Sequence, residues 1–413
     1  MQFLHESMNP TTQFQILSVL QHTSLKYWDR FSADDRNNVR TCIWAKILGH
    51  HASMPQYVLG KAYQVFALTW KCGWSSEQEG AKQELFVTIN ANLVGLKSLQ
   101  GYRAAAELLH STLDEFGSRS SAQIGASLEF HRVAHLAFEK FGLLQTFDLA
   151  LQLLQRVVET LPQAADGAVS LEQCAAIEHT SRLMESLLMW DFGCPDMLRL
   201  DRQVSSKSSK DGSGLLTPPV EWASRIIRGD LVHVLTKAHT QIVSTLVRPP
   251  QETAGAPQQA AWSRAAQHAA SATRELLTSL ASLSGDATKA DPTAYASFVE
   301  ALSEAAAGML SRCADPSARF FRPLLGWAGT GAAEEVRATA VEGAILFTQR
   351  LLGNLRLKGL VWTSVFDSLL SYLVQLLVTL ATELRGLSRR HWARISSGVG
   401  VSLAAEDDSH LSI

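Results

Sequence analysis

The sequence predicts an all-α fold built from stacked antiparallel pairs of helices, and three observations support this prediction. Apolar residues recur at steps of three and four along most of the chain, which is the spacing of one helix face. Residues typical of helix N-termini precede several of these stretches. The apolar–polar alternation that is typical of strands does not extend over comparable lengths.

Four apolar stripes mark the clearest predicted helices. The longest runs from Leu144 to Leu161 and places six large side chains on one face. The shorter stripes are Val58, Ala62, Val65 and Thr69; Phe86, Ile89, Leu93 and Leu96; and Tyr102, Ala105, Leu109, Leu113 and Phe116. Each predicts an amphipathic helix that packs on a core.

Helix starts are predicted by a serine followed three residues later by an acidic residue or glutamine. These pairs are Ser32 with Asp35, Ser76 with Glu79, Ser120 with Gln123, and Ser170 with Gln173, and Asp291 precedes Pro292 in the same role. The four serines lie about forty to fifty residues apart, which leaves room for two helices per interval. The spacing therefore predicts a HEAT- or armadillo-type α-solenoid over residues 1–386.

Two polar or proline-containing segments predict loops between repeats, near residues 203–218 and 248–260. Residues 258–310 are rich in alanine, which favours helices with small packing residues. Residues 387–413 lose helical spacing and predict a disordered or unrelated tail.

The composition limits the classes of partner. Lys and Arg number 37 against 39 Asp and Glu, so a general affinity for nucleic acid is not expected. The five cysteines are scattered, which favours a reducing compartment, and the N-terminus lacks a secretory signal pattern. Residues 360–384 are apolar enough to span a bilayer, but Asp367 would cost roughly 2.5–3.5 kcal/mol there. A polar stripe on this segment favours a packed helix, so no membrane insertion is predicted.

The sequence contains none of the common catalytic or nucleotide-binding motifs, so neither an enzyme nor a cofactor is predicted. Glu129, His131 and His135 could form an acid–base or metal group, but hydrogen-bonded histidines on an amphipathic helix are the favoured interpretation. Cys42 and Cys174 lie in apolar stripes and are expected to be buried. Tryptophans near helix ends, Trp28, Trp70 and Trp190, are expected to fill gaps between successive repeats.

Three local strings resemble one group of proteins, the exportin-4 branch of the importin-beta-like (karyopherin) nuclear transport receptors. Ser127-Leu-Glu-Phe-His131 follows a serine-rich turn and precedes the long predicted helix, as the matching string does in that family. Leu188-Met-Trp-Asp-Phe192 and, after a loop, Thr217-Pro-Pro-Val-Glu-Trp222 resemble two further strings in the same order. The stretch through Trp28 resembles the second helix of the family's first repeat, which implies an N-terminal fragment that lacks the first helix.

The resemblance implies a receptor that shuttles between nucleus and cytoplasm, binding Ran-GTP and protein cargo and contacting nuclear pore proteins. In that family the second helices of early repeats carry the polar side chains that contact the GTPase. By position these would here include Lys61, Gln64 and Lys71. A HEAT scaffold without Ran dependence, and an enzyme that uses Glu129 and His131, are the alternatives.

Overall fold

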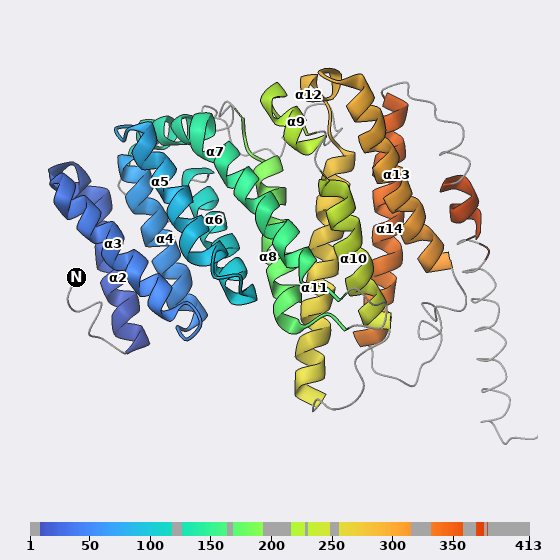
Figure 1. The fold of residues 1–413 in the computed structure, drawn as a ribbon, viewed down its shortest axis with the longest axis horizontal. Helices are drawn as coiled ribbons and strands as arrows, with labels where there is room; N and C mark the ends of the chain where they lie inside the picture. Colours follow the sequence, from blue (N-terminus) through green and yellow to red (C-terminus); the bar gives the residue numbers. More distant parts are fainter. Residues whose placement is uncertain are drawn as a thin grey trace, which may run out of the picture. The chain divides into compact units, whose positions relative to one another are not determined.

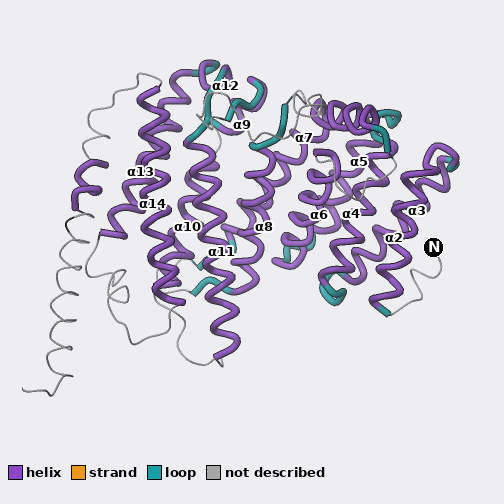
Figure 2. Tube along the Cα trace, turned by 180° about the vertical axis from the view of Figure 1, so that it is seen from behind, coloured by secondary structure: helices purple, strands orange, loops and turns teal. Residues whose placement is uncertain are grey.

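The computed structural model is helical, and it describes residues 9–117, 126–162, 168–192, 216–227, 230–247, 256–314, 332–357, 369–375 and 378. The helices are α2 (Pro10–Tyr27), α3 (Ala33–His50), α4 (Gln56–Gly73), α5 (Glu79–Ile89), α6 (Leu99–Gly117), α7 (Leu128–Glu159), α8 (Leu171–Leu188), α9 (Ala223–Ile226), α10 (Leu231–Val247), α11 (Ala256–Ala281), α12 (Asp286–Lys289), α13 (Pro292–Ala314) and α14 (Ala332–Leu357). Short helical turns are η1 (Trp28–Arg30), η2 (Asn90–Val94) and η4 (Val220–Trp222). Over the described ranges Figure 2 shows helices and loops without a strand, and the all-α prediction is confirmed.

The chain divides into two compact units. The first comprises Met1–Ala305 with Leu346–Val361, and the second comprises Ala306–Ile345 with Trp362–Ile413. The described part of the second unit holds the end of α13, the first half of α14 and helical residues 369–375 and 378. The prediction of one repeat region over 1–386 stays a prediction, and the predicted tail lies outside the described residues.

Helices of the first unit pack in two sets (Figure 1). In one set α2 packs against α4, α4 against α6, α6 against α8, and α8 against α11. In the other set α3 packs on α4, α7 on both α6 and α8, and α10 on α11 and α7. Helices α2, α4, α6 and α8, which are alternate in sequence, are therefore neighbours in space, and packing of this kind lets helices bury their apolar faces.

Local sequence signals place several helix starts. Ser32 and Ser170 each begin a helix with a reciprocal capping box, and Asp291 accepts a hydrogen bond from the backbone N–H of Ala294 at the start of α13. Ser76 does not start a helix, because its hydroxyl donates to the carbonyl of Gly73, and α5 begins at Glu79 after Gln78. The predicted start at residue 120 lies outside the described residues.

The core follows the predicted stripes. All residues of the α4 and α6 stripes are buried, whereas Leu96 is exposed at the end of the α5 stripe. Trp74 is the centre of the largest aromatic cluster, with the rings of Phe116 and Phe138 each 5.3 Å from its ring centroid. Cys42 and Cys174 are buried, as their places in the apolar stripes predict, and Trp28, Trp70 and Trp190 are buried too.

The loop prediction near 248–260 is wrong in its last part, because α11 begins at Ala256. Pro257 stands in the first turn of that helix, where its missing N–H has no intrahelical acceptor to lose. Of the apolar segment 360–384, only residues 369–375 and 378 are described, and these are helical. Among the helices described, none is long and apolar enough to cross a membrane.

Candidate protein-binding face

Polar side chains bridge each pair of neighbouring helices in the set α2, α4, α6, α8 and α11. We call this series of side chains the polar row; it comprises Gln21, Gln56, Lys61, Gln64, Arg103, Glu107, Glu178, His179, Arg182, Glu185, His268 and Ser279. Most of these side chains are partly exposed, so they can bind one another and still contact a partner.

The joint between α2 and α4 is made by Lys61. Its ammonium donates to the side-chain oxygen of Gln21 and, over 3.3 Å, to that of Gln64. Burial lowers the pKa of Lys61. Among the described residues both acceptors are neutral amides, and no ion pair with a carboxylate forms. Lys61 is therefore a half-buried ammonium whose hydrogen-bond acceptors are neutral, and the carboxylate of Glu115 attracts it as well.

Helices α4, α6 and α8 meet at the carboxylate of Glu107. The Gln56 amide donates to its Oε2 over 3.2 Å, and Arg103 Nε donates to its Oε1 over 2.7 Å. His179 of α8 places Nε2 3.2 Å from the same Oε1. Burial lowers the pKa of His179, and the Glu107 carboxylate opposes that shift. One carboxylate thus joins three helices that are distant in sequence.

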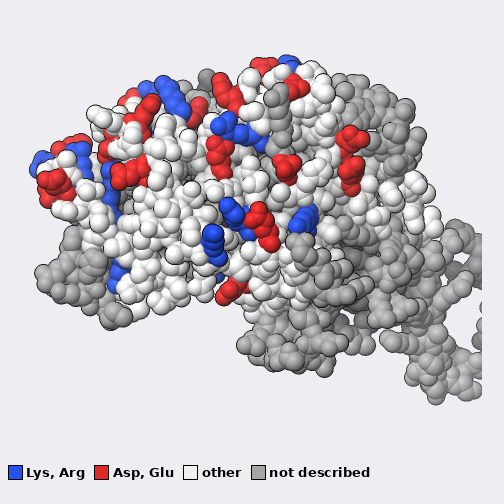
Figure 3. All heavy atoms as spheres, in the orientation of Figure 1, with Lys and Arg blue, Asp and Glu red and all other residues white. Residues whose placement is uncertain are grey.

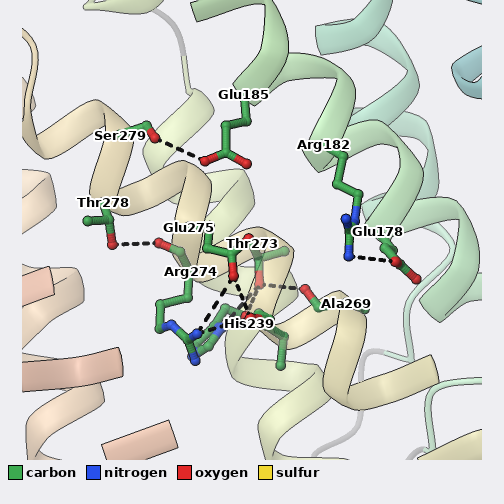
Figure 4. A network of polar contacts seen from close by, with 12 residues as sticks. Glu178, Arg182, Glu185, His239, Ala269, Thr273, Arg274, Glu275, Thr278 and Ser279 are labelled. Carbon is green, nitrogen blue, oxygen red and sulfur yellow. Dashed lines mark hydrogen bonds and ion pairs between the residues drawn. The ribbon is translucent and has the colours of Figure 1, made fainter. Parts of the chain in front are cut away.

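Helices α8 and α11 are joined by two further contacts. His268 Nδ1 lies 3.5 Å from Glu178 Oε1, which also pairs with Arg182 over 3.1 Å. Two turns farther along α8, the Ser279 hydroxyl donates to Glu185 Oε1 over 3.3 Å (Figure 4). Burial raises the pKa of Glu185. Figure 4 shows the Glu185 carboxylate pointing toward Ser279 of α11, and with the contact of Glu178 with His268 the polar row continues across this pair.

Charges of both signs occur together on this protein. In the view of Figure 3, basic and acidic side chains are intermingled, and neither sign forms a continuous patch on the described surface of that face. Mixed charge of this kind discriminates between protein partners, whereas a nucleic-acid site needs clustered positive charge.

The three candidate contact residues do not share one environment. Lys61 and Gln64 are joined by a hydrogen bond on the polar row. Lys71 is buried, because its ammonium donates to the backbone carbonyl of Glu115 near the end of α6 and lies 3.6 Å from the Glu115 carboxylate. Burial lowers the pKa of Lys71 to about 8. In this conformation Lys71 offers no surface to a partner, and contacts of Lys61 and Gln64 with a GTPase stay predictions.

A pocket of about 470 Å³ lies on the other side of α4, between α3 and α5. Arg40 lies in its wall, with its guanidinium 4.0 Å from the Trp70 ring centroid. The guanidinium donates to Glu77 Oε1 over 2.8 Å and to the carbonyl of Thr69 over 3.0 Å. Burial lowers the pKa of Arg40, and Glu77 opposes that shift. Arg40 thereby ties α3 to α4 and to the loop before α5.

The alternative acid–base group does not assemble around Glu129 and His131. Glu129 is exposed and pairs with Arg132 at 2.6 Å, and a hydrogen bond from Arg132 lowers its pKa. His131 is buried on the same helix, and His135 is buried with its ring nitrogens 3.3 and 3.0 Å from the carbonyl oxygens of Phe116 and Asp191. These histidine contacts are those of structural side chains at a helix junction.

The residues that sequence reasoning missed are those joined across helices, above all Glu107, His179, Glu178 and His268. Their signal in the sequence is weak, since each is only a polar residue on an amphipathic helix. Glu107 and His179 are brought together by the packing of α6 on α8. No periodicity within either helix indicates that contact.

Sequence comparison finds no matching protein-family model and no matching curated protein. The fold and the polar row are those of an all-helical protein for which these comparisons identify no family.

Proposed function

We propose that this chain is a helical-repeat protein that binds other proteins through the polar row, as a nuclear export receptor binds Ran-GTP together with cargo. The observation that carries the proposal is the continuity of the polar row across α2, α4, α6, α8 and α11. Such a series of half-buried groups of both signs suits an extended protein surface better than a small ligand.

The packing order supports a HEAT- or armadillo-type repeat. Helices of the set that carries the polar row contact one another in sequence order, and α3, α7 and α10 pack beside them. In stacks of this kind each unit contacts mainly its neighbours, so one set of helices presents a long binding surface. The same architecture lets binding at one place change the fit at another.

Ran-GTP and cargo are proposed from the resemblance of the strings Ser127–His131, Leu188–Phe192 and Thr217–Trp222 to the exportin-4 branch. A receptor of this class moves between nucleus and cytoplasm and contacts nuclear pore proteins. Its action is reversible binding, and binding of Ran-GTP and of cargo strengthen each other reciprocally.

Equilibrium titration of the chain with Ran tests this proposal. We expect Ran loaded with a non-hydrolysable GTP analogue to bind at least about tenfold more tightly than Ran-GDP, a difference of about 1.4 kcal/mol. The substitution Arg182→Glu, on the polar row, should weaken binding, whereas Lys289→Glu on the short helix α12 should not.

Two results would count against the proposal. Absence of binding in both nucleotide states would exclude the Ran-dependent function. Equal binding of both states, still lost on Arg182→Glu, would indicate the alternative of a protein-binding scaffold without nucleotide dependence.

A further inference from the structure

Two aromatic rings are exposed side by side at the α2 end of the polar row. Phe14 of α2 and Tyr57 of α4 have ring centroids 5.8 Å apart. Their exposed fractions are 37% and 54%. Exposed tyrosines and other aromatic residues are over-represented among the residues that dominate protein–protein binding energy, because they bury a large area with little loss of side-chain entropy.

The ammonium of Lys61, whose hydrogen-bond acceptors are neutral amides, lies beside these rings. Lys61 Nζ is 5.7 Å from the Phe14 ring centroid, and Tyr57 is one helical turn before Lys61 on α4. Its acceptors, Gln21 and Gln64, are uncharged, and the Glu115 carboxylate that also attracts it lies 3.6 Å from the Lys71 ammonium. A carboxylate brought to this half-buried site would gain more from the ion pair than it would at a fully exposed lysine.

The Phe14–Tyr57 ring pair and the Lys61 ammonium together favour one kind of partner. We infer that Phe14, Tyr57 and Lys61 anchor a protein segment in which a carboxylate side chain stands next to an aromatic or large aliphatic one. The apolar side chain covers the two rings, and the carboxylate pairs with Lys61. The inference rests on the proposed function and adds to it the place and the chemistry of one contact.

The surroundings favour an acidic segment of protein over a nucleic acid. One lysine neutralises a single charge, whereas nucleic-acid affinity needs several clustered cations. The next charged centre along the polar row is the ion pair of Arg103 with Glu107, which adds no net positive charge. A phosphate chain running along the row would find that arginine already paired, whereas a peptide can present a carboxylate to Lys61 and neutral groups beyond it.

Fluorescence anisotropy with the full chain tests this inference. The probe is a fluorescein-labelled twelve-residue peptide of glycine and serine with Asp-Phe-Asp at its centre. Matched peptides carry Asn-Phe-Asn, which lacks the charge, or Asp-Ser-Asp, which lacks the ring. We expect the first peptide to bind at least about fivefold more tightly than either control, since each lost contact is worth about 1 kcal/mol.

Variants of the chain locate the site. Tyr57→Ser and Lys61→Gln should each weaken the Asp-Phe-Asp peptide by about fivefold or more. Lys61→Arg, which keeps the charge, should bind nearly as the unchanged protein, and Lys82→Gln on α5 should have no effect. Circular dichroism of each variant confirms that its helices are retained.

Equal binding of the three peptides, absence of binding, or indifference to Tyr57→Ser would overturn the inference. Sedimentation that shows self-association abolished by Tyr57→Ser would overturn it too, because a second copy would then cover the rings. Ran binding is measured on the same proteins. Binding of the Asp-Phe-Asp peptide without binding of Ran-GTP would refute the proposed function and support this contact. Binding of Ran-GTP without binding of the peptide would support the proposed function and refute this contact.

Discussion

The buried ion pair between Lys71 and Glu115 gives the sharpest prediction about stability. Their side chains are 0% and 2% exposed, and Nζ lies 3.6 Å from Oε1. Removing one partner leaves a charge in the interior, which costs about 3–5 kcal/mol. We therefore expect Lys71→Met and Glu115→Met each to lower the free energy of unfolding by that amount.

The double variant Lys71→Met/Glu115→Met should behave differently from either single one. Replacing both charges with apolar side chains removes the desolvation cost together with the attraction, so the loss should be less than about 1 kcal/mol. Urea unfolding followed by circular dichroism measures all four proteins, and Lys289→Met, at an exposed lysine, is the matched control with a change below about 0.5 kcal/mol. Single-variant losses below about 1 kcal/mol, as measured for exposed pairs, would refute the reasoning.

Three further predictions follow from buried groups and close contacts. Burial lowers the pKa of Lys71 from 10.5 to about 8, so between these pH values the unfolded state binds more protons than the folded state. The stability of the unchanged protein relative to Lys71→Met should therefore rise with pH over that window, by on the order of 3 kcal/mol. A difference in urea unfolding that does not change with pH would contradict this. Arg40→Lys should lower the free energy of unfolding by about 2–4 kcal/mol in the same assay, because a lysine cannot stack on Trp70 and also donate to both Glu77 and the carbonyl of Thr69. An unchanged midpoint of urea unfolding would show that the guanidinium is dispensable. Gly142→Ala should cost about 1–3 kcal/mol, because an added Cβ would lie 2.4 Å from a ring carbon of Phe138. Gly60→Ala on α4 should instead stabilise the helix by up to about 1 kcal/mol, because an added Cβ there would meet nothing within 4 Å. A change of the same sign in both variants would contradict the packing argument.

Local features of the fold could be predicted from the sequence because local interactions decide them. The capping boxes at Ser32 and Ser170 depend on residues three positions apart, and the buried stripe from Tyr102 to Phe116 depends on steps of three and four. Ser76 shows the limit of such signals. Its hydroxyl has a competing acceptor in the last turn of α4, so the observed cap, Gln78, lies two residues beyond the predicted one.

Contacts between distant helices could not be predicted in this way. Lys71 follows Lys61 and Gln64 by steps that keep it near the same side of α4, so its spacing predicts exposure. The structure buries it, because Glu115 at the end of α6 covers this part of α4. The joint of Glu107 with His179 depends equally on which helices become neighbours. A single helix pattern specifies which face is polar but not what lies against it.

Covalent footprinting of lysines in the complex with Ran-GTP tests the proposed binding surface most directly. Lys61 lies on the polar row, while Lys82 and Lys289 lie on α5 and α12. Labelling with an amine-reactive reagent, read by mass spectrometry, should be slowed at Lys61 when Ran-GTP binds and remain unchanged at Lys82 and Lys289. Slower labelling at Lys82 with no change at Lys61 would show that partners bind elsewhere on the protein.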